Sequence, residues 1–306
     1  DLGGRLRSRE GGADLVTSLV MIDGRPMPPE QAKVSVFDRG FLYGDSVFEA
    51  LRTYAGRPFA LRRHLTRLQE SAARVFIDMP VSLEQLGLEV ESAIVGAGNA
   101  ESYVRLTVTR GVGETLGLDP GLSRHALRVI IVTPLKSPPF ETYRDGVGVI
   151  THRTERVTDH SAAAGAKVGN YLMAVLASRE ARLANAAEAL IVDGRGAVVE
   201  GATSNVFVVL PDGTLVTPPE SDGILLGITR ENVLAVAAEL GIPVRLESLP
   251  LERVKSAAEV FFTSSIRELV PVVRIDGTRI GDGTPGITTL RLLTAFREAC
   301  LRSVAL

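Results

Sequence analysis

Apolar and polar residues alternate in short runs along much of the chain, and this two-residue period predicts β-strands. In the run SYVRLTVTRG, the apolar residues Val104, Leu106 and Val108 would share one face of a strand. The polar positions between them share the opposite face and are Tyr103, Arg105, Thr107 and Thr109. Further strands are predicted from similar apolar runs, several of which turn at a DG or AG pair. These strands lie within residues 18–27, 47–60, 125–134, 146–153, 188–201, 205–218 and 259–266.

A longer period predicts a helix in LRRHLTRLQESAARVFIDMP, and Pro80 ends the pattern. The apolar face of this helix consists of Leu61, Leu65, Leu68, Ala72 and Val75. The neighbouring face carries His64, Arg67 and Ser71. Three more helices are predicted over residues 170–186, 227–242 and 287–303. Gly241 closes the second of these as its C-terminal cap.

Strands and helices follow one another without strict βαβ alternation, so we expect an α+β fold. The segment LKSPPFETYRDG, with its two adjacent prolines, is the best candidate for a linker. The first residues show no period, begin with Asp and lack the apolar core of a signal peptide, which indicates a flexible leader or a remnant of cloning. We therefore predict four regions: this leader (1–17), a small N-terminal domain (18–134), a linker (135–145) and a larger C-terminal domain (146–306).

The composition is that of an ordinary globular protein, with 45% hydrophobic and 23% charged residues among 306. A net charge of −2 gives no support for nucleic-acid or anionic-membrane binding, and no apolar run reaches the roughly 20 residues that span a bilayer. The single cysteine, Cys300, excludes an internal disulfide and favours a cytoplasmic location. One cysteine and four scattered histidines lack the spacing of metal ligands, so we expect no metal site.

The run SAAAGAKVGNY places Lys167 among small residues, in a chain where arginine supplies 30 of the 34 basic residues. Lysine, unlike arginine, can lose its proton and act as a nucleophile. A solvated loop lysine is the ordinary alternative. A lysine that forms a Schiff base with pyridoxal phosphate (PLP) needs three partners: an acid facing the pyridine nitrogen, a donor to the phenolate oxygen, and a cradle for the phosphate.

Candidates for the acid and the cradle occur further along the chain. Glu200 follows an apolar run and precedes Gly201, which places it at a strand end, although hairpin glutamates are usually exposed. Ile228 and Thr229 open a helix whose free N–H groups suit a dianion, while Thr229 could equally be a plain N-cap. Arg67 could add a bidentate contact to the phosphate, or could be one of many surface arginines.

Two glycine-rich stretches, GVGETLG and GAGNAES, do not match the dinucleotide pattern G-x-G-x-x-G. A Rossmann fold is therefore disfavoured. We interpret residues 111–118 as a mobile loop that follows a strand, a common place for substrate contacts.

Several ordered blocks resemble the class IV aminotransferases, the PLP fold type IV that includes branched-chain, D-amino acid and aminodeoxychorismate lyase enzymes. The resemblance covers roughly residues 18–300. It rests on DRGFLYGDSVFEALR, HLTRLQESA, YVRLTVTRG, AKVGNYL, EALIVDGRGAVVEGATSNVFVV, GITRENV and FFTSSIRELVPV. It implies a two-domain fold like that of D-amino acid aminotransferase, with a small N-terminal α/β domain and a larger C-terminal pseudo-barrel domain that binds PLP.

The resemblance also implies roles for individual residues. Lys167 would be the Schiff-base lysine and proton shuttle, Glu200 the partner of the pyridine nitrogen, and Tyr171 the donor to the phenolate oxygen. The phosphate cradle would consist of Arg67, Ile228, Thr229 and Ser265. The substrate pocket would be lined by Tyr43, Phe48, Arg52, Tyr103, Arg105, Ser264 and Ile266.

The resemblance implies transfer of an amino group between branched-chain L-amino acids and 2-oxoglutarate. The Tyr103–Arg105 pair favours this assignment, while the short KVGNY spacing and the FFTSSIRE block are closer to the lyase and D-amino acid branches. They leave open aminodeoxychorismate lyase, a D-amino acid aminotransferase, and a specificity broadened to D-amino acids or (R)-amines. A non-catalytic member of the fold is disfavoured because Lys167 and Glu200 are both retained.

Members of the family are at least dimers whose active sites are shared between protomers. We therefore expect a homodimer or a higher homo-oligomer that binds amino acid and keto acid substrates. Tyr43 and the loop 111–118 are the segments expected to reach the neighbouring site.

Overall fold

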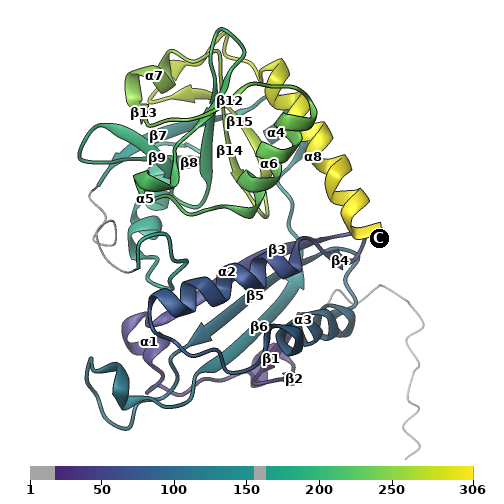
Figure 1. Ribbon diagram of the computed structural model, residues 1–306, viewed down its shortest axis with the longest axis vertical. Coiled ribbons are helices and arrows are strands. Elements are labelled where there is room, and N and C mark those ends of the chain that lie inside the picture. The colour runs from purple at the N-terminus through teal and green to yellow at the C-terminus, as the bar shows by residue number, and fades with distance from the viewer. Residues whose placement is uncertain (1–17, 155–162, 306) are drawn as a thin grey trace, which may run out of the picture.

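The computed structural model describes residues 18–154 and 163–305, so the predicted leader lies outside the described residues. The chain forms two β-sheets with helices packed on them, a mixed α+β architecture as predicted (Figure 1). None of the helices within these described ranges is long and apolar enough to cross a membrane.

The N-terminal part folds into a six-stranded antiparallel sheet in the order β2-β1-β6-β5-β3-β4. Its strands are β1 (Leu19–Ile22), β2 (Arg25–Met27), β3 (Ser46–Tyr54), β4 (Arg57–Pro58), β5 (Ser102–Thr109) and β6 (Leu127–Pro134). The β1–β2 hairpin turns at Asp23 and Gly24, whose φ angles are 48° and 78°. These left-handed conformations match the twist of a tight hairpin, which confirms the DG turn.

Three helices accompany this sheet: α1 (Arg39–Tyr43), α2 (Leu61–Arg74) and α3 (Leu83–Ala97). Helices α2 and α3 cover one face, where Val104, Leu106 and Val108 are fully buried beneath them. The intervening residues of β5 face away from these helices, as the alternation predicts.

Two details of these helices differ from the predictions. Helix α2 ends at Arg74, well before Pro80, because the chain leaves helical geometry at Val75 and takes a positive φ at Phe76. Helix α3 was not predicted. Leu88 and Val95 are apolar but exposed, so the sequence of α3 does not show a clear apolar face. Ser82 caps the N-terminus of this helix, but the capping residue was not recognised.

The C-terminal part forms a ten-stranded sheet in the order β12-β11-β10-β14-β15-β7-β8-β9-β13, with β16 paired to β15. The strands are β7 (Val147–Arg153), β8 (Glu188–Val192), β9 (Ala197–Gly201), β10 (Asn205–Val209), β11 (Leu215–Thr217), β12 (Val244–Leu246), β13 (Leu249–Pro250), β14 (Glu259–Ser264), β15 (Glu268–Ile275) and β16 (Thr278–Arg279). Only three residues join β9 to β10, yet four strands separate them in the order. The sheet must therefore curl to bring these two strands together.

The helices of this part are α4 (Phe140–Arg144), α5 (Leu172–Leu183), α6 (Ile228–Glu239), α7 (Leu251–Lys255) and α8 (Ile287–Ala305). Single 3₁₀ turns occur at Pro29–Gln31, Pro120–Leu122 and Glu220–Asp222. Helices α6 and α8 pack against β14, and α5 packs against β8. Helix α8 also reaches the first sheet, where Arg57 donates to the Val304 carbonyl at 3.0 Å (Figure 1).

The loop that precedes α5 joins the two sheets. The Phe48 N–H donates to the Lys167 carbonyl at 3.0 Å, and the Gly169 N–H donates to the Ser46 carbonyl at 2.7 Å. Between these bonds, Val168 forms an isolated antiparallel bridge with Val47 of β3. The chain around Lys167 is therefore attached to the first sheet, although it leads into the second.

Candidate functional site

A cavity of about 590 Å³ lies where the two sheets meet, and residues from both line it. The predicted site residues that line this cavity are Phe48, Arg67, Tyr103, Arg105, Lys167, Tyr171, Glu200, Ile228, Thr229, Ser264, Ser265 and Ile266. Tyr43 and Arg52 do not line it. The curl of the second sheet and the attached loop thus collect residues that lie up to 219 positions apart in the sequence, from 48 to 267.

Lys167 sits inside the cavity with its amine among aromatic rings. Its Nζ donates to the Tyr171 hydroxyl at 3.1 Å and lies 4.6 Å from the centre of the Phe48 ring. The backbone N–H of Lys167 donates to Ser71 of α2 at 3.1 Å, which fixes where the side chain begins. The rings and the short loop give the amine a defined, partly desolvated position, as a nucleophilic lysine requires.

Glu200 lies at the end of β9, as the sequence predicts, and points into the cavity. Its Oε2 accepts hydrogen bonds from the Leu225 N–H at 3.0 Å and from the Asn205 side chain at 3.4 Å. These two contacts hold the Glu200 carboxylate in a position where it can face a protonated ring nitrogen.

Helix α6 opens onto the same cavity with Gly227 at its N-cap and no side-chain cap. Its first N–H groups and the positive end of its dipole are therefore available to a dianion. A Cβ at position 227 would collide with the Asn205 side chain, so glycine is needed for this close approach. Two buried hydroxyls in the cavity wall, those of Ser204 and Thr263, have no partner among the described residues. These unpaired groups fit a polar ligand at this end.

Arg67 reaches the cavity from α2 and is held from behind by Glu49 of β3. Its Nε and Nη2 donate to the two carboxylate oxygens of Glu49 at 2.7 and 2.6 Å. Its Nη1 donates to the Leu226 carbonyl at 2.8 Å, just before the N-terminus of α6. Two of its five N–H groups remain for a ligand.

Behind Arg67, Nδ1 of His64 lies 2.7 Å from Oε2 of Glu49, and both side chains are buried. Burial would raise the pKa of Glu49, but the positive charge of Arg67 and the hydrogen bonds from His64 and Arg67 lower it to about 2. Burial lowers the pKa of His64, against the attraction of Glu49. Glu49 is therefore an anion at neutral pH.

The other wall of the cavity is aromatic and cationic. Phe48 and Tyr171 meet edge to face with ring centres 4.9 Å apart, and the Arg105 guanidinium lies 3.9 Å from the centre of the Phe48 ring. No carboxylate of the described residues is paired with Arg105. Arg267, in the turn between β14 and β15, forms an ion pair with Glu188 at 2.6 Å. This wall can receive an apolar group and also offers the positive charge of Arg105.

Tyr43 and Arg52 have other contacts. The hydroxyl of Tyr43 accepts a hydrogen bond from the Gly117 N–H at 3.2 Å. Arg52 stacks on the ring of Tyr54, forms an ion pair with Glu268 at 3.5 Å, and donates to the carbonyl of Ile266 at 3.4 Å. Through this last bond Arg52 supports the turn that carries Ile266, rather than lining the cavity itself.

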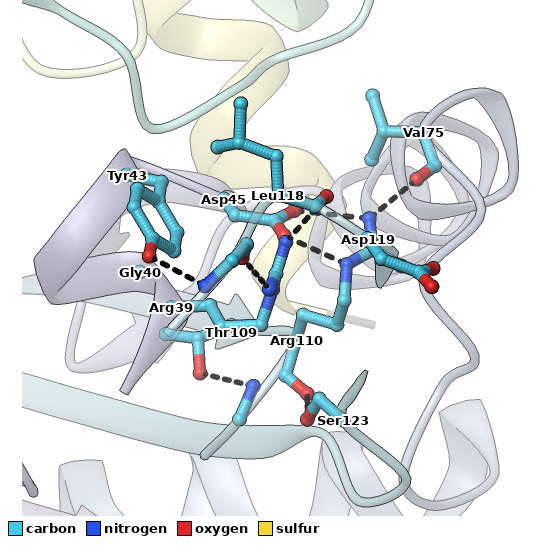
Figure 2. Close-up of polar contacts among 12 residues, drawn as sticks. Arg39, Gly40, Tyr43, Asp45, Val75, Thr109, Arg110, Leu118, Asp119 and Ser123 are labelled. Carbon is cyan, nitrogen blue, oxygen red and sulfur yellow. Dashed lines mark hydrogen bonds and ion pairs between the residues drawn. The ribbon is translucent and has the colours of Figure 1, made fainter. Parts of the chain in front are cut away.

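The loop 111–118 is anchored beside Tyr43 by two arginines (Figure 2). Arg39 donates to the carbonyls of Gly117 and Leu118 at 2.7 and 3.1 Å. Arg39 and Arg110 both bond Asp45, at 3.0 and 2.7 Å respectively. Burial would raise the pKa of Asp45, but the hydrogen bonds from Arg110 and Arg39 lower it. The loop is thus held by charge-assisted bonds.

Sequence reasoning did not assign several residues of the site: Glu49, His64, Ser71, Thr203, Ser204, Asn205, Thr263 and Arg267. A signal for three of them, Glu49, His64 and Ser71, was present in the sequence. His64, Arg67 and Ser71 follow helical spacing on the polar face of α2, and Glu49 interrupts the buried side of β3 between Val47 and Leu51. A charge on the buried side of a strand requires a partner of opposite charge.

Comparison with known proteins gives a consistent family. The model of the family "Amino-transferase class IV" matches residues 46–275. A Methanocaldococcus jannaschii protein provisionally named branched-chain-amino-acid aminotransferase is 40% identical over 91% of this chain and 95% of its own length. The D-alanine aminotransferase of Bacillus licheniformis is 32% identical over 94% of this chain and 98% of its own length.

A solved structure is similar over nearly the whole chain. The T.th. branched-chain amino acid aminotransferase with pyridoxamine 5'-phosphate superposes with a TM-score of 0.87 and 32% identity, over 93% of this chain and 94% of that one. The similarity in sequence and in structure therefore covers nearly the whole chain and not only the residues that line the cavity.

Proposed function

The chain belongs to the class IV aminotransferases, and from that premise we propose that it uses PLP to move an amino group between branched-chain L-amino acids and 2-oxoglutarate. The observation that carries this proposal is the composition of the cavity. It combines a placed lysine, an anion at a strand end and an open helix N-terminus with a wall of Phe48, Tyr103 and Arg105.

The residues present fit PLP. Arg67 and the first N–H groups of α6 would hold the phosphate, with Ser265 in the same wall. Glu200 would face the pyridine nitrogen, and Tyr171 would donate to the phenolate oxygen. Bound there, PLP would supply an electron sink for the negative charge that develops on the substrate α-carbon. Lys167 Nζ would take the α-proton, and its bond to the Tyr171 hydroxyl would orient it.

The aromatic wall supports the substrate assignment. A branched side chain can pack against Phe48, while the distal carboxylate of glutamate can pair with Arg105, which has no carboxylate partner among the described residues. Structures of the T.th. enzyme carry N-(5'-phosphopyridoxyl)-L-glutamate and 4-methylvaleric acid, which correspond to these two kinds of substrate. One pocket would thus accept both partners of the exchange.

The test is a half-reaction screen of the PLP-loaded protein. L-leucine, L-glutamate, D-alanine and (R)-1-phenylethylamine are mixed separately with the protein, and the rate of loss of the cofactor absorbance is measured. We expect L-leucine and L-glutamate to react fastest. D-alanine reacting much faster than L-leucine would replace the proposal with a D-amino acid aminotransferase, which the Bacillus licheniformis relative makes the second candidate. A colourless protein that takes up no PLP would refute both.

We also propose that two copies share their active sites. The surface around α1 and the loop 111–118 exposes large apolar side chains, among them Phe41, Val112, Leu116 and Leu118. Because Arg39 and Arg110 hold this loop in place, it presents a preformed apolar surface (Figure 2). Tyr43, which does not line the cavity of its own chain, would reach that of the second copy. Sedimentation should give a dimer, and Leu118→Asp should weaken it.

A further inference from the structure

The phosphate end of the cavity carries less positive charge than a dianion requires. The Arg67 cation is paired through two hydrogen bonds with the Glu49 anion, so the two together contribute no net charge. The N-terminus of α6 adds about half a positive charge. A bound phosphate dianion would therefore leave excess negative charge in a buried region, where charge is poorly screened.

His64 is the titratable group placed to supply the missing charge. It is 1% exposed, contacts Glu49 and does not itself line the cavity. Because an ionised carboxylate only accepts hydrogen bonds, Nδ1 of His64 donates to it and Nε2 is the nitrogen that can gain a proton.

The charged groups that act on His64 are Glu49 of β3, Arg67 of its own helix and Lys167 of the loop before α5. Glu49 favours the protonated ring, and the two cations oppose it. A dianion at Arg67 would offset both cations, so it would shift this balance towards the imidazolium form.

We propose that Glu49 and His64 are positioning residues of the phosphate site and that His64 takes up one proton from solvent when a dianion binds beside Arg67. This inference rests on the proposed function, which places the cofactor phosphate at Arg67. Nε2 of His64 gains the proton while Nδ1 keeps its hydrogen bond to Glu49. Glu49 thus holds Arg67 in position and connects it to His64. The proton that His64 gains offsets part of the negative charge of the ligand.

The test measures protons taken up by the cofactor-free full chain when it binds sulfate, a dianion that does not itself titrate near neutral pH. Calorimetry in two buffers of different ionisation enthalpy gives the number of protons per sulfate. We expect close to one proton for the wild type and a Kd for sulfate that rises by up to about tenfold per pH unit between the free and bound pKa values of His64. His64→Gln should take up almost none, with a Kd that is nearly independent of pH.

Lys167→Ala and His152→Gln are the matched controls, because Lys167 and His152 are ionisable side chains that line the same cavity. We expect both variants still to take up close to one proton, and Lys167→Ala to do so over a higher pH range, because a cation that opposes protonation of His64 is removed. Uptake that persists in His64→Gln, or disappears in either control, would overturn the assignment to His64. If His64→Gln fails to fold by circular dichroism, wild-type uptake that is retained in both controls supports the proposal, and wild-type uptake near zero overturns it.

The outcome separates this inference from the proposed function. A wild-type protein that binds PLP and transaminates, but binds no sulfate or takes up no proton with it, refutes the inference alone. A wild-type protein that binds no PLP refutes the proposed function.

Discussion

Two arginines of one cavity, Arg67 and Arg105, are held in opposite ways. Arg67 is buried and donates to both oxygens of Glu49 and to a backbone carbonyl. Arg105 lies over the face of Phe48 and pairs with no carboxylate of the described residues. A fixed guanidinium suits a ligand that stays bound, whereas one resting on a ring can serve a substrate that arrives either charged or apolar.

The energetics of the two sites differ accordingly. Removing one partner of a buried ion pair leaves the other unpaired in a medium of low dielectric, which typically costs about 3–5 kcal/mol. A cation over an aromatic ring contributes only about 0.5–2 kcal/mol. Arg67 is therefore expected to contribute to the free energy of unfolding as well as to ligand binding, whereas Arg105 is expected to contribute mainly to ligand binding.

The largest expected effect comes from removing Lys167, which lines the same cavity as the two arginines. Lys167→Ala should lower turnover by about 10⁴-fold or more while both arginines stay in place, because neither can take the substrate α-proton. The variant should still bind PLP, noncovalently, through the phosphate contacts. Steady-state rates with L-leucine, together with PLP retention after gel filtration, check both points. Near-normal turnover would refute the role of Lys167.

Arg67→Met tests the fixed arginine. It should lower the free energy of unfolding by about 3–5 kcal/mol, because Glu49 would be left buried without its cation. It should also weaken PLP binding by at least about tenfold. Urea unfolding and PLP titration measure the two effects.

Arg63→Met is the control for Arg67→Met. Arg63 lies on the same helix and pairs with Glu231, but both side chains are about half exposed. Its loss should change the free energy of unfolding by less than about 1 kcal/mol. Equal effects of the two substitutions would contradict the distinction between buried and exposed pairs.

The pH dependence of stability tests Glu49, the partner of Arg67. The pKa of Glu49 is about 2 in the folded protein, below its ordinary value of 4.5. A lowered pKa means that its contribution is present above pH 4.5 and is lost as the pH falls towards 2. The contribution is on the order of 3 kcal/mol. Urea unfolding of the wild type and Glu49→Gln at several pH values isolates it, and a wild-type curve parallel to that of the variant would count against it.

Arg105→Met should have the smallest and most selective effect. It should lower kcat/KM for L-glutamate by about 10- to 100-fold, since one charge-assisted contact is lost, and change the value for L-leucine less than about threefold. L-leucine is the internal control within the same variant. A similar loss for both substrates would show that Arg105 supports the pocket in general.

The features predicted most accurately from the sequence are those that neighbouring residues determine. The alternation in β5, the DG turn after β1 and the start of α6 at Ile228 are set by neighbouring residues, and the structure confirms them. Helix α3 was missed because two exposed apolar residues disguise its stripe. The two-domain boundaries stay a prediction.

The residues of the cavity also divide into those predicted from local sequence and those that depend on tertiary packing. Lys167 and Glu200 were predicted from distinctive local settings, small flanks in one case and a strand end in the other, and both side chains line the cavity. The bond between Glu49 and Arg67 could not be read from the sequence, since it depends on how α2 packs on β3. Tyr43 and Arg52 were predicted to contact substrate, but the chain folds their side chains outside its own cavity.

The attachment of the Lys167 loop to the first sheet has a consequence for assembly. Glu200 lies on the ten-stranded sheet and α6 packs against that sheet, whereas bonds to Ser46, Phe48 and Ser71 fix the backbone around Lys167. A fragment containing only residues 146–306 would keep the anion and the open helix end but would leave the lysine without a fixed position. Recovery of activity during refolding should therefore coincide with docking of the two sheets, and not with the formation of either one.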